Sequence, residues 1–308
     1  MVDAVTTTGR PEAIRAVPVR RPGRWFAIAG IALVGAMLMN MFITNQNFNW
    51  SEQRKYALDI NVLEGVRTTL WLTVGAMAIG LLLGIVMAVM RLSRNPLVSG
   101  AAWLYVWVFR GTPVLVQLLF WANIGALLPT VGIGVPFGPE FMTWKTFDLV
   151  PSLAAALLGL GLNEGAYMSE IVRAGILSVD EGQNEAATAL GLSRMQTLRR
   201  IVLPQAMRVI VPPFGNETIS MLKTTSLVAY VPFYELLFAV QNIYVRTYQV
   251  MPMLIMVSLW YLFISSILTV GQFYIERHYA KGATRNLPPT PAEKFKRVAA
   301  NISGRRLR

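Results

Sequence analysis

The chain has 308 residues, of which 54% are hydrophobic and 14% are charged, and its formal net charge is +12. This is more apolar surface than one soluble core buries, so the composition indicates a protein that crosses a membrane several times. With no cysteine and one histidine, disulfides and thiolate metal sites are excluded, and neither zinc nor histidine chemistry is expected. The basic residues are divided among several loops rather than gathered in a stripe with aromatic residues, and we therefore expect no nucleic-acid partner.

Six apolar runs are long enough to cross a hydrocarbon core about 30 Å thick as helices. They cover residues 25–44, 70–90, 101–128, 149–171, 209–232 and 251–274. The fourth and fifth are the weaker predictions because each contains charged residues, and a buried helix of a soluble protein is the alternative for every run. In the first run, Met and Phe occupy positions where a signal-peptide cleavage site needs small residues, so this helix is expected to be retained. The pattern predicts an all-α, polytopic membrane protein with six transmembrane helices.

The distribution of charge predicts the orientation of these helices. Lysine and arginine outnumber acidic residues in the N-terminal tail (1–24), the link after the second run, the segment 178–204 and the C-terminal tail (280–308). The alternate loops are nearly balanced. Since positively charged loops stay in the cytoplasm, both termini and the segment 178–204 are predicted to be cytoplasmic, which agrees with an even number of spans. We expect the tails to be solvated and the C-terminal tail to contact anionic lipid headgroups.

The segment 178–204 is polar and basic although apolar runs lie on both sides of it. Ser178 and Glu181 have the spacing of a capping box, and Asp180 lies beside them, so a helix is predicted to begin here. Gly191 is expected to end that helix. The segment therefore begins with one short helix that stops at a glycine.

A second short helix follows in the same segment. Ser193 and Gln196 repeat the capping-box spacing, and Pro204 is expected to prevent the helix from continuing. Met195, Leu198 and Val202 share one face of this helix. Two short helices with one apolar side and several charges are suited to docking on a partner protein.

The spacing within this segment resembles the EAA loop of bacterial ABC-importer permeases. The residues that fit its pattern without a gap are Glu185, Ala186, Ala187, Gly191, Ile201, Leu203 and Pro204. The stretches "FRGTP" (109–113), "AYMSEIVRAGI" (166–176) and "PPFGNETISMLKTTSL" (212–227) are similar to the polar-amino-acid branch of that family. The resemblance covers about residues 62–279. An additional N-terminal helix (25–44) and both tails lie outside it. One departure is Asp180, where the family often has proline.

The resemblance implies a permease subunit of an importer for a polar or charged amino acid, in the bacterial cytoplasmic membrane. It implies that the loop docks on a cytoplasmic ATPase dimer, with Glu185 pairing with a basic group, Ala186 and Ala187 permitting close approach and Gly191 forming the turn. A second permease subunit, identical or related, and an extracytoplasmic amino-acid-binding protein are the other implied partners. This chain has no G-x-x-x-x-G-K-[ST] phosphate loop, so ATP is expected to bind to the partner, and the chain is expected to be neither an enzyme nor a cofactor-binding protein. The alternative for the loop is an amphipathic segment that lies on the bilayer.

Polar residues within apolar runs are costly in lipid and therefore indicate a pathway or a partner contact. Asn163, Tyr167 and Glu170 share one helix face, and the fifth run repeats that spacing. The candidate substrate-pathway residues are Glu164, Tyr167, Glu170, Asn216, Ser220 and Lys223. Their charges are of both signs, which leaves the transported amino acid open. The alternative is structural, since Glu170 and Arg173 can pair within one turn, and Asn216 or Lys223 can join helices.

Glycine and proline predict close helix contacts and one hinge. The pairs Gly80/Gly84 and Gly161/Gly165 have the spacing that lets two helix backbones approach, and packing explains them better than a gate does. Arg110, Gly111 and Pro113 form the candidate hinge, because proline removes a helical hydrogen bond. Arg110 is also a possible substrate contact.

Two other classes of protein compete with the importer. A secondary carrier driven by an ion gradient would use the buried charges as ion-binding groups, but no inverted repeat of the spans is visible and the short-helix segment would have no purpose. A membrane anchor for a cytoplasmic complex would explain that segment but not the buried charges.

Overall fold

The computed structural model describes residues 22–135 and 138–279, together with the single residues 293 and 296. The chain divides into two units, residues 1–49 and 50–308. The predicted tails (1–24 and 280–308) lie outside the described residues except at 22–24, 293 and 296. The first unit consists of α1 (Pro22–Thr44) and the 3-10 turn η1 (Gln46–Phe48). The described side chains of α1 are all exposed, so this helix buries none of them within its own unit.

Within the described residues, three helices are long and apolar enough to cross a membrane. They are α1, whose apolar part is Phe26–Thr44, α3 (Ile60–Arg91) and α13 (Val250–Tyr279). The pair α4 (Pro96–Gly111) and α5 (Val114–Ala122) meets the same criterion together. The helices α8 (Ser152–Leu177) and α11 (Leu203–Thr224) occupy the positions of the fourth and fifth predicted runs but contain charged residues. The chain is helical as expected, while the number of six spans remains a prediction.

The third apolar run consists of two helices that meet at an angle of 100°, and the break between them lies at the candidate hinge of Arg110, Gly111 and Pro113. Pro113 has no backbone N–H and restricts the residue before it, and Thr112 is extended (φ −115°, ψ 144°). The carbonyl oxygen of Phe109, freed by the break, accepts hydrogen bonds of 2.9 Å from the side-chain amides of both Gln117 and Asn163. The bend is thus fixed by α5 and α8.

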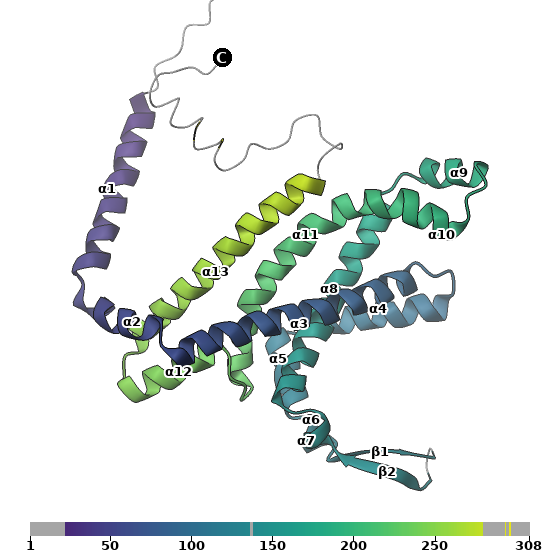
Figure 1. Ribbon diagram of the computed structural model, residues 1–308, viewed down its shortest axis with the longest axis horizontal. Helices are drawn as coiled ribbons and strands as arrows, with labels where there is room; N and C mark the ends of the chain where they lie inside the picture. Colours follow the sequence, from purple (N-terminus) through teal and green to yellow (C-terminus); the bar gives the residue numbers. More distant parts are fainter. Residues whose placement is uncertain (1–21, 136–137, 280–292, 294–295, 297–308) are drawn as a thin grey trace, which may run out of the picture. The chain divides into compact units, whose positions relative to one another are not determined.

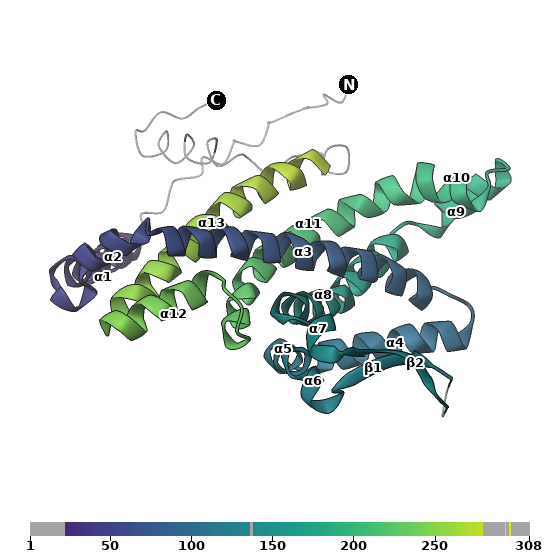
Figure 2. The same cartoon turned by 60° about the horizontal axis from the view of Figure 1, so that its bottom comes forward.

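The second unit is built around the long crossing of α3 and α8 (Figure 1). A Cβ atom added to Gly80 would lie 2.5 Å from Cγ of Glu164, and Gly84 faces Met168 in the same way. The predicted close approach of these glycine-containing helices is therefore confirmed. α5 packs on α8 as well, and Figure 2 shows the two helices side by side, viewed almost along their axes.

The other end of α3 belongs to a second cluster. It includes α2 (Trp50–Ala57) and α12 (Leu236–Thr247), which packs on α3 and α13 and follows the 3-10 helix η3 (Thr225–Tyr230). Its buried core residues are Val62, Leu236, Val240, Met253, Met256 and Val257. The sequence analysis did not predict α2 or α12, since both are too short to appear as apolar runs.

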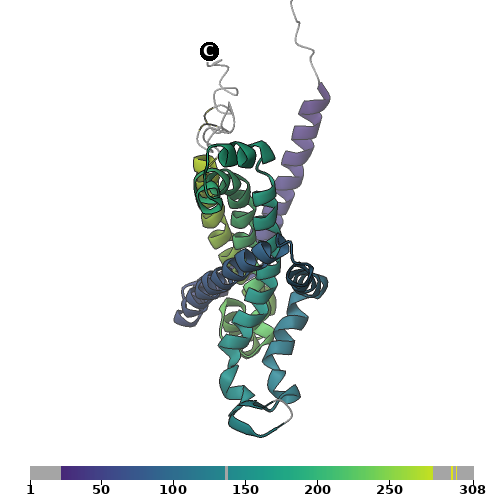
Figure 3. The ribbon, with the colours of Figure 1, turned by 90° about the vertical axis from the view of Figure 1, so that its right-hand side faces the viewer.

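A small antiparallel hairpin interrupts the helical architecture, and the sequence analysis did not predict it. Its strands are β1 (Thr130–Gly134) and β2 (Glu140–Lys145), flanked by α6 (Ile124–Leu127) and α7 (Thr146–Leu149). Thr130 pairs with Lys145, and the register shifts at Gly134. Figures 1 and 3 show this hairpin at one end of α8, opposite the end at which α9 (Glu181–Ala189) and α10 (Arg194–Thr197) lie.

The two short helices of segment 178–204 are present as predicted, with two corrections. The N-cap of α9 is Asp180, whose Oδ1 accepts the N–H of Gly182 at 2.8 Å, whereas Ser178 ends α8 and donates to the carbonyl of Gly175. The predicted stop at Pro204 is wrong. After α10 the chain continues through a π-helical segment η2 (Leu198–Val202) directly into α11. Pro204 lies in the first turn of α11, where the backbone N–H that proline lacks is not required for an intrahelical hydrogen bond.

Candidate functional site

The turn between α9 and α10 is fixed by local chemistry. Gly191 adopts φ +73°, a left-handed conformation that favours glycine, and its N–H donates to the carbonyl of Thr188 at 3.0 Å. The predicted second capping box is confirmed: Oγ of Ser193 accepts the N–H of Gln196, and Oε1 of Gln196 accepts the N–H of Ser193 at 2.9 Å. These bonds hold the helical hairpin 178–204 in a defined shape.

The motif residues of this hairpin divide into exposed and buried sets. Glu185 and Ala186 are exposed, whereas Ala187 is fully buried against the following segment and thus contributes to the hairpin itself. The apolar side chains of Leu190 and Met195 are 79% and 62% exposed. Of the remaining motif residues, Ile201 is half-buried, and Leu203 and Pro204 are exposed. The hairpin therefore carries exposed apolar side chains together with an exposed carboxylate.

A polar cavity of about 570 Å³ lies between the α4–α5 bend, α8 and α11. The polar and charged residues that line it are Arg110, Thr112, Asn163, Glu164, Tyr167, Glu217, Ser220 and Thr224. Gly111, Pro113, Val114 and Met221 complete its wall. The bend thus turns the chain and leaves a cavity beside α8.

Glu164 is the most unusual group in this cavity. Its side chain is 3% exposed, and its Oε1 has no hydrogen-bond partner among the described residues. Glu217 on α11 is close enough for its negative charge to repel that of Glu164. A buried carboxylate without a donor costs free energy unless a proton, a water molecule or a cationic ligand satisfies it.

The positive group of the cavity comes from the last turn of α4. The guanidinium of Arg110 is 5.0 Å from the ring centroid of Tyr167, in a cation–π contact, and it also interacts with the charge of Glu217. Arg110 therefore bridges the end of α4 to both α8 and α11. The cavity presents two carboxylates and one guanidinium, the groups that complement an amino acid.

Three of the predicted pathway residues lie elsewhere. Glu170 forms ion pairs with Arg91 (3.4 Å) and Arg173 (2.7 Å), which connect the end of α3 to α8. Asn216 accepts a 2.9 Å hydrogen bond from Gln272 of α13. Lys223 is exposed and does not line the cavity. Glu164, Tyr167 and Ser220 do line it.

The sequence analysis omitted Glu217 and Thr224 from the candidate site. The face of α11 that lines the cavity contains Glu217, Ser220, Met221 and Thr224, a spacing of i, i+3, i+4 and i+7. The predicted face began one residue earlier, at Asn216. The sequence did contain a signal for Glu217. Of the adjacent residues Asn216 and Glu217, the carboxylate costs more free energy to place in lipid, so it was the stronger candidate for the cavity.

Residues 80–281 match the protein family described as "Binding-protein-dependent transport system inner membrane component". The arginine transport system permease protein ArgU of Corynebacterium glutamicum is 46% identical over 286 residues, which cover 91% of this chain and 88% of that protein. The glutamine transport system permease protein GlnP of Escherichia coli is 33% identical, over 70% of this chain and 91% of the relative.

Two solved structures resemble the fold. A crystal structure of an amino acid ABC transporter with histidines aligns with a TM-score of 0.60 and 33% identity, covering 71% of this chain and 94% of that chain. The MetNI methionine ABC transporter in an inward-facing conformation aligns with a TM-score of 0.56 at 18% identity, over 72% of this chain and 97% of that chain, and supports the fold alone. The chain therefore belongs to the family of binding-protein-dependent inner membrane transport components, as a multi-pass permease subunit of an amino-acid ABC transporter in the cytoplasmic membrane.

Proposed function

We propose that this permease imports an amino acid with a cationic side chain and that the hairpin 178–204 couples its movement to a separate ATPase. The observation that supports the cargo is Glu164, a buried carboxyl group that has no hydrogen-bond donor among the described residues and that lines the cavity near Glu217. A cationic side chain would satisfy both acidic groups. Arg110, which also lines the cavity, would attract the carboxylate of the amino acid.

The names of the relatives agree with this proposal without deciding it. One relative is named for arginine, whereas others are named for glutamine and cystine. The proposal of a cationic cargo therefore rests on the residues that line the cavity of this chain. Of the two cations that would favour an acidic cargo, Lys223 lies outside the cavity lining, and only Arg110 lies within it.

The connection between hairpin and cavity supports the proposed coupling. The last turn of α8 leads directly to α9, and α10 continues through η2 into α11. The same two helices, α8 and α11, form two walls of the cavity. A movement of the hairpin would thus reach both walls, so closure of an ATPase dimer would favour one of two states of the cavity.

The proposed assembly contains an ATPase dimer, a second permease subunit, identical or related, and an extracytoplasmic binding protein. Two ATPase subunits require two docking hairpins, and this chain provides one. The exposed Glu185, Leu190 and Met195 form the surface that we assign to the ATPase. The family description, which names binding-protein-dependent transport, supports the third partner.

The test is uptake of arginine and glutamine in proteoliposomes that contain the assembled transporter and its binding protein. Glu164→Gln should reduce arginine uptake about tenfold, the effect of losing about 1.4 kcal/mol of charge-assisted interaction, and should affect glutamine less. Lys223→Gln is the matched control, because it removes a charge outside the cavity. If Glu164→Gln took up arginine and glutamine at the same rates as the unaltered protein, the proposed cationic cargo would be refuted. If the variant no longer associated with the ATPase, it would be misassembled.

A further inference from the structure

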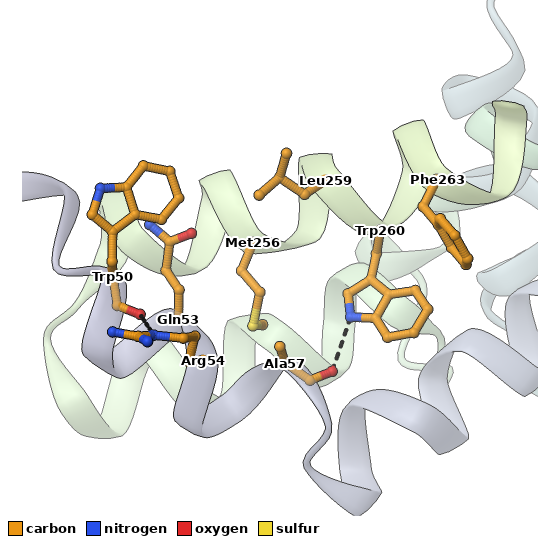
Figure 4. A pocket seen from close by; sticks show the side chains of 8 residues that line it. All are labelled: Trp50, Gln53, Arg54, Ala57, Met256, Leu259, Trp260 and Phe263. Atoms are coloured by element: carbon orange, nitrogen blue, oxygen red, sulfur yellow. Dashed lines mark hydrogen bonds between the residues drawn. The ribbon is translucent and has the colours of Figure 1, made fainter. Parts of the chain in front are cut away.

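A second hollow lies far from the substrate cavity along the chain, between α2 and α13, with a volume of about 450 Å³ (Figure 4). Its walls are almost entirely apolar. Met256, which is 2% exposed, lies among the core residues, while Leu259 and Phe263 are about half exposed along the outer side of α13. From Met256 to Phe263 the helix rises about 10 Å, which gives the groove the length of an extended hydrocarbon segment.

The polar end of the indole in this groove is already satisfied. Nε1 of Trp260 donates to the carbonyl oxygen of Ala57 at 3.0 Å, which joins the last residue of α2 to α13. The indole is therefore held in place and offers the groove its apolar ring. A ligand that fits these walls needs little hydrogen-bonding capacity along most of its length.

One end of the groove differs from the rest. Figure 4 shows Arg54 beside Trp50 at this end and Phe263 at the other. Nε of Arg54 is 3.4 Å from the carbonyl oxygen of Trp50, and within the described residues its guanidinium forms no ion pair. Arg54 is the one charged residue among the described residues that line the groove.

The neighbouring cation provides a contrast. Nζ of Lys55 lies 3.6 Å from a carboxylate oxygen of Glu52 and 4.9 Å from the centroid of the Tyr56 ring. The charge of Lys55 is therefore balanced on α2 itself, whereas the charge of Arg54 is directed to the end of an apolar groove. This arrangement matches an elongated ligand with an anionic head.

We propose that the groove between α2 and α13 binds one anionic phospholipid, with its phosphate on Arg54 and an acyl chain along Met256, Leu259 and Phe263. A guanidinium pairs well with phosphate oxygens, and tryptophan is enriched where headgroups meet hydrocarbon. Because α13 is long and apolar enough to cross the membrane, its exposed side contacts acyl chains, and the groove opens on that side. A net-negative headgroup balances a charge that the described protein residues leave unpaired.

The experiment uses the complete transporter in phosphatidylcholine nanodiscs that contain a small fraction of phosphatidylglycerol with a photoreactive diazirine on an acyl chain. After irradiation, mass spectrometry maps the labelled residues. We expect labelling concentrated on residues 256–263 and reduced about tenfold by Arg54→Gln, a factor that corresponds to 1.4 kcal/mol. Lys55→Gln, which removes a charge of equal sign one residue away, should leave it unchanged.

A second measurement needs no variant. Unlabelled phosphatidylglycerol should displace the probe from residues 256–263, and unlabelled phosphatidylcholine should not. The proposal is overturned by equal competition from both lipids, or by labelling that spreads evenly over other exposed residues of α13 such as Ile267 and Val270, which would indicate surrounding bilayer lipid only. Absence of labelling in the groove would indicate that a protein helix covers it, and it would overturn the proposal as well.

Discussion

The hydroxyl of Tyr261 on α13 donates a 3.0 Å hydrogen bond to the carboxylate of Glu235, which precedes α12. Glu235 is fully buried, and its other carboxylate oxygen accepts the N–H of Phe238 at 2.6 Å. Thr69 of α3 lies 3.5 Å from the same carboxylate and accepts the N–H of Leu236. One acidic side chain therefore joins three helices and caps one of them.

The first prediction follows from the protonation of this group. Burial raises the pKa of Glu235 from 4.5 to about 7, although hydrogen bonds from Leu237, Phe238, Tyr261 and Thr69 act in the opposite direction. The folded protein therefore binds this proton more tightly than the unfolded chain does. Between pH 4.5 and 7 the free energy of unfolding should fall as pH rises, by an amount on the order of 3 kcal/mol, and the contribution should be lost above pH 7.

Glu235→Gln cannot titrate and should remove this part of the pH dependence. Thermal unfolding of the detergent-solubilised protein, measured from pH 5 to pH 8, compares the two proteins. Glu140→Gln, which changes an exposed carboxyl group on β2, should keep the dependence of the unaltered protein. A parallel pH profile for the unaltered protein and Glu235→Gln would contradict the prediction.

The second prediction concerns the turn of the hairpin 178–204. Within the described residues, no atom apart from those of Gly191 and its two chain neighbours lies within 4 Å of a Cβ added there, so the constraint is the backbone angle of +73° and not space. Gly191→Val should be strained by about 1 to 2 kcal/mol, and Gly191→Asn, a residue that tolerates this conformation, should cost less. Copurification with the ATPase should be lost in the valine variant and largely kept in the asparagine variant, while both insert in the membrane. Full ATPase association of Gly191→Val would show that the turn does not define the docking surface.

The third prediction concerns the contact between α3 and α8. A Cβ at Gly84 would meet the backbone of Met168 and Ser169, which cannot move aside as a side chain end can. Gly84→Ala should therefore destabilise the protein by about 1 to 3 kcal/mol despite the better helix propensity of alanine. Gly271→Ala in α13, where nothing lies within 4 Å, is the matched control and should be neutral or stabilising. Equal melting temperatures for the two variants would refute the importance of this contact.

Sequence reasoning succeeded where a local pattern decides the structure. The capping box of Ser193 and Gln196 and the glycine turn at residue 191 depend on neighbouring residues alone, and the structure confirms both. The glycine spacing of α3 and α8 was equally readable, because small residues four positions apart lie on one face. The docking role of the hairpin stays a prediction, since it depends on a partner chain.

The wrong predictions arise where backbone hydrogen bonding departs from the simple local rule. Pro204 was expected to end a helix, but the π-helical segment before it changes the hydrogen-bond register and lets the helix continue. The bend lies at the candidate hinge of Arg110, Gly111 and Pro113, but its angle was not predictable, because it depends on the side-chain amides of Gln117 and Asn163 that satisfy the carbonyl oxygen freed there. The polar cavity lies beside that bend, so its lining could be predicted only in part.

The last prediction separates the two acidic residues of α8 that the sequence grouped together. Glu170 lies between Arg91 and Arg173, and its side chain is 22% exposed, so its charge is neutralised within the protein. Glu170→Gln would leave two guanidinium groups facing each other and should lower the melting temperature, by an amount equivalent to roughly 1 kcal/mol for a partly exposed pair. Because Glu170 does not line the cavity, uptake of arginine and of glutamine should fall by the same factor in this variant, whereas Glu164→Gln should change their ratio. Competition uptake with both amino acids in one proteoliposome preparation measures the ratio directly. If Glu170→Gln altered the ratio while Glu164→Gln did not, the ion cluster at the end of α3 would be the selective site, and the cavity beside the bend would be structural.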